Sequence, residues 1–367
     1  MNDDIAAIRA EHVGSLLRPA ALRRARQSVE AGEMPVAHMI ALEDAEIERA
    51  LRIQEEIGMG SVTDGEYRRR WWQYDYFRGL NGVSAVDSDG GSGRAWSSVT
   101  GAAVVGGGDR IALTGRIAFD DHPMLRHFAF IRERARAVPR TSIPSPSVLH
   151  SSLARSGVSA DHYPDPHELA HDIARAYRDA ISAFHRAGCN YLQLDDTTLA
   201  AFCSGISTLP SGHSLDDYVT LLSGSLRDRP RDMTIAMHIC RGNYRSAWRW
   251  SGGYEAIADA VFNRLPIDRY FLEYDSERAG GFDPLRFLPA GKQVVLGLVT
   301  SKSGALEHVD ALASRIREAE RFTPLERLAL SPQCGFASTE EGNLLSDEEQ
   351  WAKLRLVVET ARDVWGG

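Results

Sequence analysis

The sequence predicts an α/β protein folded as a (β/α)8 TIM barrel, and three observations support this prediction. Eight apolar segments of strand length alternate with amphipathic helical segments, a pattern typical of a parallel sheet covered by helices. Polar residues follow these segments, at the strand ends where such barrels carry their chemistry. No G-x-G-x-x-G motif follows the first segment, which weakens the alternative of a doubly wound open sheet. We therefore expect one barrel domain over residues 1–367.

The eight expected strands are short runs of apolar or β-branched residues, each followed by a polar turn. The clearest is Met233–Met237, which leads directly into His238. Strand 141–147 is expected to end in a loop bounded by prolines. The expected strands end near residues 15, 66, 145, 195, 240, 273, 300 and 334.

Helices are expected between these strands because start and stop signals frame their apolar stripes. Asp165 and Pro166 provide a cap and a first-turn proline, and Gly188 ends that helix. A capping box at Ser346 opens the last helix. The expected helices cover about 19–29, 36–57, 125–137, 165–188, 215–226, 254–265, 305–319 and 346–361.

Residues 82–120, after the second strand, differ in composition from the rest of the chain. Serine, glycine and aspartate cluster at 87–93, and three glycines occupy 106–108. Residues 99–117 alternate weakly between apolar and polar. This pattern predicts a loop or hairpin excursion from the barrel and no second domain.

Composition excludes several classes of protein. The net charge is −8, and the only basic block is Arg68–Arg70, so nucleic acid is not an expected partner. No apolar run approaches the roughly 18 residues that span a membrane. The acidic start lacks the features of a signal peptide, and four cysteines are too few for a disulfide scaffold. We therefore expect a cytoplasmic protein, and self-association into a homo-oligomer stays open.

His238 and Cys240 are separated by one residue, so on a strand they point to the same side. An imidazole and a thiolate together suit Zn²⁺, which accepts nitrogen and sulfur ligands. An H-x-C pair alone also fits a core histidine beside a buried cysteine. Cys189 and Cys203 lack polar neighbours of ligand type, and we expect them to be core residues.

Seven polar residues occupy the predicted strand ends, and a closed barrel would bring them to one mouth. Two thiolates, an imidazole and a carboxylate among them would make a tetrahedral set for Zn²⁺. Each has a structural alternative, such as a buried small residue for Cys334 or a helix cap for Asp195. The seven are Ser15, Glu66, Asp195, His238, Cys240, Glu273 and Cys334.

Several motifs resemble the cobalamin-independent methionine synthases, in their C-terminal catalytic barrel. The H-I-C motif at 238–240, Glu273 and the S-P-Q-C-G-F motif at 331–336 resemble the zinc signature of that family. The segments 12–15, 64–66 and 193–196 are similar to its first, second and fourth strand motifs. The resemblance covers nearly the whole chain.

The resemblance implies a zinc-dependent thiol S-methyltransferase, similar to 5-methyltetrahydropteroyltriglutamate–homocysteine methyltransferase and to enzymes of methionine biosynthesis. Its expected partners are a small-molecule thiol and a methyl donor. It implies that Ser15, Glu66 and Asp195 hold the amino-acid part of a homocysteine-like thiol. It also implies a set of zinc ligands, of which the carboxylate is the weakest and the natural one to yield to a substrate sulfur. That set is His238, Cys240, Glu273 and Cys334.

The chain also departs from the family pattern. It has one barrel where the full-length enzymes have two, which is closer to the short methionine synthase II-like relatives. The loop Thr300–Gly304 lacks the family's histidine, which leaves His12 and Lys302 as candidate acids. Two alternatives therefore stay open. One is a thiol alkyltransferase of the epoxyalkane:coenzyme M type, and the other is a non-catalytic barrel stabilised by zinc.

Overall fold

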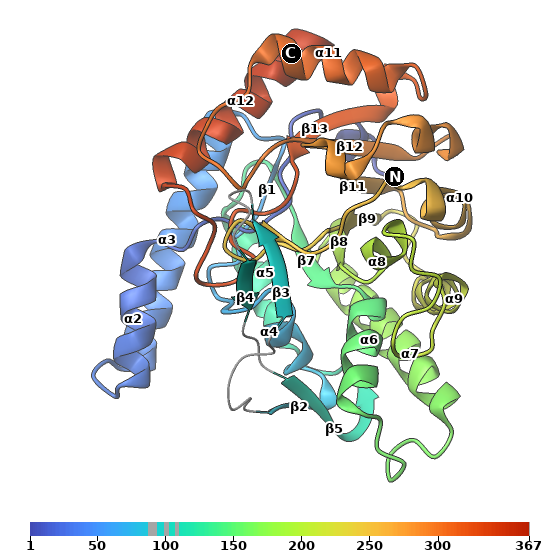
Figure 1. Ribbon diagram of the computed structural model, residues 1–367. Helices are drawn as coiled ribbons and strands as arrows, with labels where there is room; N and C mark the ends of the chain where they lie inside the picture. The colour runs from blue at the N-terminus through green and yellow to red at the C-terminus, as the bar shows by residue number, and fades with distance from the viewer. Residues whose placement is uncertain (87–93, 99–102, 107–109, 367) are drawn as a thin grey trace.

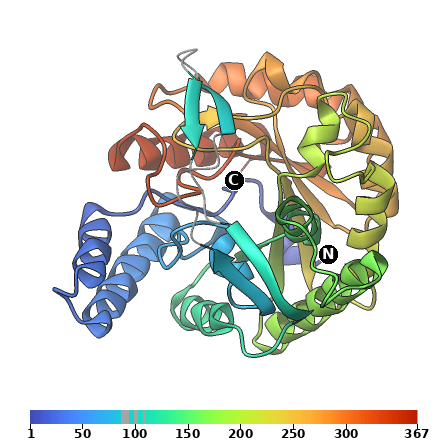
Figure 2. The same cartoon turned by 60° about the horizontal axis from the view of Figure 1, so that its bottom comes forward.

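The computed structural model describes residues 1–86, 94–98, 103–106 and 110–366. The chain folds as the predicted TIM barrel, with a parallel sheet surrounded by helices (Figure 2). Six strands form a continuous parallel sheet in the order β13-β12-β11-β9-β8-β7. All of their residues are buried, as expected for strands that are covered on both faces. Their bounds are β7 Thr141–Pro144, β8 Tyr191–Asp196, β9 Thr234–Ile239, β11 Arg269–Glu273, β12 Gln293–Val299 and β13 Leu328–Pro332.

The first two strand positions close the barrel with very little regular ladder. Ala10 bridges Leu330 of β13 in parallel, and this bridge is the whole first strand. The second is β1 (Ser61–Val62), which pairs in parallel with β6 (Val138–Pro139), just before β7. Both are shorter than the sequence predicted.

Buried side chains replace the missing ladder between these segments. The Thr63 hydroxyl donates to the Gly14 carbonyl at 2.6 Å. The guanidinium of Arg140 and the amide of Gln193 donate to the Val13 carbonyl, at 3.1 and 2.8 Å. These contacts satisfy backbone groups that a longer strand would have paired.

Helices follow the strands and enclose the sheet, while the α2–α3 pair lies on the outside of the barrel (Figures 1 and 2). No helix within the described residues is long and apolar enough to cross a membrane. The helices are α1 Asp3–Ala7, α2 Ala20–Glu30, α3 Val36–Ile57, α4 Tyr74–Phe77, α5 Pro123–Arg134, α6 Pro146–Ser156, α7 Pro166–Arg186, α8 Leu199–Cys203, α9 Leu215–Ser225, α10 Glu255–Arg264, α11 Val309–Glu320 and α12 Asp347–Trp365.

Two helix predictions were wrong in detail. The expected loop after β7 is helix α6, because Pro146 occupies its first turn, where a missing N–H costs nothing. Helix α11 begins at Val309, four residues later than expected. Residues 305–308 are not helical. They are instead bound by helix α12, where the Lys353 ammonium contacts the Glu307 carboxylate at 2.9 Å.

The excursion after the second strand is built from antiparallel strands, in line with the prediction. β2 (Asn81–Val86) pairs with β5 (Arg110–Ala118), and β3 (Arg94–Ser98) pairs with β4 (Ala103–Gly106). β3 also pairs with β10 (Ala247–Trp248), which follows β9 in sequence. The expected polar segment 87–93 and the glycines at 107 and 108 lie outside the described residues.

Candidate functional site

Four side chains converge at the C-terminal ends of three strands. His238 lies near the end of β9 and Cys240 just beyond it, Glu273 ends β11, and Cys334 follows β13. One ligand atom from each of these residues lies within 4.8 Å of the others, and all four residues are buried. The barrel therefore brings together the residues that the sequence predicted as metal ligands.

The cluster fits a metal with mixed nitrogen, sulfur and oxygen ligands. Within the described part of the chain, neither imidazole nitrogen of His238 has a hydrogen-bond partner, although both are buried. Such groups are costly to bury unless something binds them. The Sγ atoms of Cys240 and Cys334 are 3.5 Å apart. That is too long for a disulfide and close to the ~3.8 Å that two ~2.3 Å Zn–S bonds at a tetrahedral angle would give.

The pKa values of the two thiols and the imidazole are shifted because these groups lie together in a buried cluster. A hydrogen bond from the Cys240 thiol holds the pKa of Cys334 well below its usual range, and the pKa of Cys240 is raised. Burial lowers the pKa of His238, but direct contact with the Cys334 sulfur and the negative charges of Cys334, Asp195 and Glu273 outweigh burial and raise it to about 9. These shifts share one geometric cause, which is the close approach of the two sulfur atoms and the imidazole in a buried cluster.

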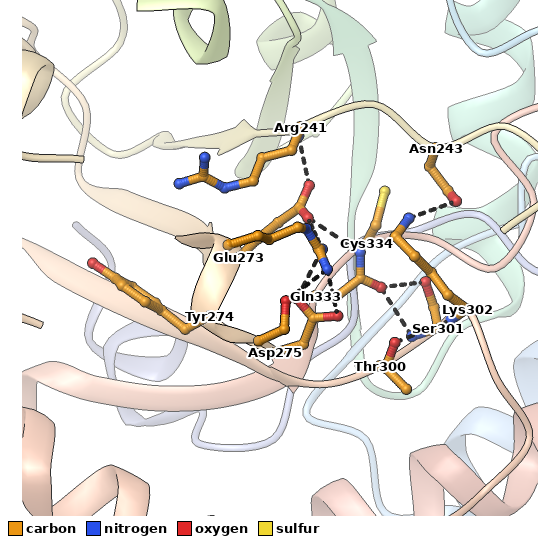
Figure 3. A network of polar contacts seen from close by, with 12 residues as sticks. Arg241, Asn243, Glu273, Tyr274, Asp275, Thr300, Ser301, Lys302, Gln333 and Cys334 are labelled. Atoms are coloured by element: carbon orange, nitrogen blue, oxygen red, sulfur yellow. Dashed lines mark hydrogen bonds and ion pairs between the residues drawn. The ribbon is translucent and has the colours of Figure 1, made fainter. Parts of the chain in front are cut away.

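Glu273 accepts hydrogen bonds from three residues, two of which are labelled in Figure 3. Its Oε1 accepts from the Arg241 backbone N–H at 2.6 Å, and its Oε2 accepts from the Gln333 side-chain amide at 3.2 Å. Oε2 also accepts from the Arg278 guanidinium at 3.0 Å. Burial alone would raise the pKa of Glu273, but the nearby positive charges of Lys302 and Arg278 keep it below the usual value. The side chain is therefore a carboxylate at neutral pH.

The three residues expected to hold the substrate line one cavity of about 230 Å³, together with His238, Cys240 and Cys334. Within the described residues, Oε2 of Glu66 has no hydrogen-bond partner, although the Arg69 guanidinium lies 3.7 Å away. Burial raises the pKa of Asp195 to about 6, and the Glu66 charge adds to this effect. Ser15 lies so close to Gly335 that a Cβ at Gly335 would be 1.9 Å from its hydroxyl oxygen.

The two candidate acids are placed differently from what was expected. Neither His12 nor Lys302 is among the described residues that line the cavity. The His12 ring contacts the Gln54 side-chain oxygen at 2.9 Å, and burial lowers its pKa to about 3. A general acid must hold a proton near neutral pH and reach the substrate, so His12 meets neither requirement. Lys302 is buried, and its ammonium donates to the Asn243 side-chain oxygen at 3.1 Å (Figure 3).

An aromatic wall, which the sequence analysis did not identify, lines another part of the cavity. The rings of Trp71 and Tyr244 stack with centroids 6.1 Å apart and an angle of 16° between their planes. The Arg249 guanidinium lies 4.7 Å from the Trp250 ring centroid. The available signal was the density of aromatic residues just after the second and fifth strands. The wall consists of Trp71, Trp72, Tyr74, Tyr244 and Trp250.

A family model and several known proteins are similar to this chain over most of its length. A family model described as the catalytic domain of cobalamin-independent synthase matches residues 147–363. Two uncharacterized proteins of Bacillus subtilis, YxjH and YxjG, are 46% and 45% identical; the matches cover 98% and 97% of this chain and 95% and 94% of theirs. The 5-methyltetrahydropteroyltriglutamate–homocysteine methyltransferase of Bacillus licheniformis is 24% identical over 96% of this chain, and the match covers 42% of that protein.

Solved structures show the same relationship. A Listeria monocytogenes protein, named provisionally as a vitamin-B12-independent methionine synthase, is 36% identical with a TM-score of 0.77, and the match covers 98% of each chain. A B12-independent methionine synthase from a Shewanella species, in complex with selenomethionine, is 18% identical with a TM-score of 0.74 and the same coverage. At that identity, the second likeness shows the fold alone.

Proposed function

The chain belongs to the family of cobalamin-independent synthase catalytic domains, and we propose that it is a zinc-dependent S-methyltransferase acting on a thiol such as homocysteine. The observation that carries the proposal is the cluster of two thiols, an imidazole and a carboxylate within 4.8 Å at the barrel mouth. When bound there, Zn²⁺ would deprotonate a coordinated substrate thiol and so supply a nucleophilic sulfur at neutral pH. Residues 1–367 would act as one zinc-binding catalytic barrel.

The residues that line the cavity favour a methyl acceptor that carries an ammonium group as well as a thiol. Glu66 and Asp195 supply two carboxyl groups beside the cluster, and Oε2 of Glu66 has no hydrogen-bond partner among the described residues. A substrate ammonium would satisfy that oxygen through a charge-assisted hydrogen bond. Ser15 would complete this part of the site, since it lines the same cavity. The role of these residues is therefore to orient the acceptor with its sulfur toward Cys240 and Cys334.

The methyl donor would approach across the aromatic wall, whose apolar rings would reduce the access of water to the reacting sulfur. A methyl group on a reduced folate leaves slowly unless its nitrogen is protonated, so that donor needs a general acid. The seventh-strand loop offers Lys302, whose ammonium donates to the Asn243 side chain, and His12 is not among the described residues that line the cavity. We therefore expect methyl-folate to react more slowly than a more activated electrophile, which would be methylcobalamin or a sulfonium or, under the alternative function, an epoxide.

Two measurements test the proposal. Elemental analysis should find about one zinc per chain, and mass spectrometry should detect methylated homocysteine when each donor is supplied in turn. Cys240→Ser should lose both zinc and product, whereas Cys189→Ser should keep both, because Cys189 is buried away from the cluster. Purified protein that holds no zinc and gains no activity from added Zn²⁺ would contradict the proposal. Faster turnover of an epoxide than of any methyl donor would identify a thiol alkyltransferase instead.

A further inference from the structure

Glu273 differs from His238 because both of its oxygens already accept hydrogen bonds from the protein. Its two oxygens accept from Arg241, Gln333 and Arg278 at 2.6, 3.2 and 3.0 Å, and its side chain is fully buried. By contrast, the His238 nitrogens have no hydrogen-bond partner among the described residues. Glu273 therefore gains less from binding a metal than His238 does, and it keeps protein partners when it leaves one.

Arg278, which donates to Oε2 of Glu273, is anchored independently of that carboxylate. Its Nη1 donates to the Ser276 hydroxyl at 2.8 Å, and its Nη2 lies 2.8 Å from an Asp275 carboxylate oxygen. The guanidinium carbon lies 5.0 Å from the centroid of the Trp248 ring. These three contacts fix the guanidinium whether or not Glu273 is bound to it.

Gln333, the second donor to Oε2, is fixed in the same way. Its side-chain oxygen accepts from the Ser301 hydroxyl at 2.6 Å and from the Ser301 backbone N–H at 2.9 Å (Figure 3). This pair of contacts settles which end of the amide faces Glu273, because the oxygen is already engaged. The NH₂ group is thus directed at the carboxylate.

We propose that Arg278 is a positioning residue that competes with the metal for Oε2 of Glu273 and so lets a substrate thiol take the carboxylate's place. This inference rests on the proposed function. A buried carboxylate released without a partner would carry a large desolvation cost, and Arg278 with Gln333 removes that cost. The exchange is balanced: one carboxylate contact is replaced by one thiolate contact, and the thiol proton passes to solvent.

The test compares zinc affinity with thiol entry in Arg278→Met. Zinc affinity is measured by competition with a chromophoric chelator, and thiol entry by the absorption change of the Co²⁺-substituted protein on addition of homocysteine. Loss of the competing donor should tighten zinc binding about five- to tenfold and should raise the homocysteine concentration for half-maximal change by a similar factor. Arg278→Lys, which keeps a charged donor, should lie close to wild type.

A control and a fallback variant complete the design. Arg286→Met removes an exposed arginine from its pair with Glu255 and should change neither measurement. Arg278→Gln keeps a neutral donor and replaces Arg278→Met if that variant does not fold, and it should shift both measurements in the same directions by less. Weaker zinc binding in a folded Arg278 variant, or no change in either quantity, would overturn the inference.

The inference and the proposed function fail in different ways. If wild-type protein binds no zinc, or if homocysteine leaves the Co²⁺ spectrum unchanged, the proposed function is wrong and this inference falls with it. If wild type binds zinc and responds to homocysteine but Arg278→Met matches it, only the role of Arg278 is wrong.

Discussion

At the scale of single residues, the cavity holds two carboxyl groups that the fold itself does not neutralise fully. Glu66→Gln and Asp195→Asn should therefore raise KM for homocysteine and leave zinc content unchanged. Each loses a charge-assisted contact of about 1.5–3 kcal/mol, which corresponds to roughly ten- to hundredfold in KM. The comparison thiol is 3-mercaptopropionate, which lacks an amino group, and neither substitution should weaken its use. Loss of zinc in these variants would place the carboxylates in the metal site instead.

His12 should make folding stability sensitive to acid. Its pKa falls from 6.5 to about 3 because it is buried, so the unfolded chain binds a proton below pH 6.5 while the folded chain does not. The contribution of His12 to stability is thus complete above pH 6.5 and is lost as pH falls towards 3. Between pH 7.5 and 5 the loss should be about 2 kcal/mol.

The measurement for His12 is urea unfolding of wild type and His12→Asn at both pH values. Asparagine keeps a donor for Gln54 but does not titrate, so its stability should change less with pH. Parallel pH profiles in the two proteins would show that other groups, such as His150 with its pKa lowered to about 4, carry the acid sensitivity.

The sequence predicted the convergence of the cluster because its members end strands, and strand ends meet in a closed barrel. It did not predict the donors around Glu273, for a physical reason. Arg278 lies in the short 3-10 helix Glu277–Ala279 after β11, and the composition of so short a segment does not fix where a guanidinium points. Gln333 lies inside the motif at 331–336, but only the structure shows its amide directed at Glu273.

At the scale of elements, β12 packs very closely at Gly297 against the backbone of Leu272 and Gln333. A Cβ there would lie 2.7 Å from Cα of Gln333 and 2.8 Å from the carbonyl oxygen of Leu272, both of which are backbone atoms. Gly297→Ala should therefore cost about 1–3 kcal/mol of unfolding free energy and weaken zinc binding, because Gln333 must shift. Urea unfolding and chelator competition measure these two effects.

Gly224→Ala is the matched control for this substitution. Gly224 lies in helix α9, and a Cβ there would meet only the Ala174 methyl at 3.9 Å. Alanine should be neutral or stabilising by up to about 1 kcal/mol, since glycine is the poorer helix former. Equal effects at the two glycines would contradict the steric explanation at Gly297.

The long strands were predictable because strands buried on both faces are continuous apolar runs, and the long helices because their apolar stripes repeat with the helical period. The first two strands were overestimated because side chains such as Arg140 satisfy the backbone where pairing was expected. Helix α6 was missed because Pro146 is as compatible with a helix start as with a loop, and sequence does not choose between them. The packing of α6 against the rest of the barrel makes that choice.

At the scale of the whole molecule, the cluster ties together strands β9, β11 and β13. A ligand that binds only the folded chain adds stability, by about 4 kcal/mol at a thousandfold excess over its dissociation constant. Removal of zinc with a chelator should therefore lower Tm by about 5 °C, as measured by differential scanning fluorimetry, and added Zn²⁺ should restore it. Cys334→Ser should show no such response. An equal Tm with and without chelator in wild type would mean that the cluster binds no stabilising metal.

The bridge between Ala10 and Leu330 also has a consequence for synthesis on the ribosome. Cys334 follows Leu330 by four positions. The last residue of the cluster therefore leaves the ribosome together with β13, the strand that pairs with the first strand position at Ala10. A growing chain can expose His238 and Cys240 long before it can assemble the complete cluster. Binding of a metal by all four side chains would thus require a closed barrel. A nascent or truncated chain would bind zinc more weakly than the complete protein does.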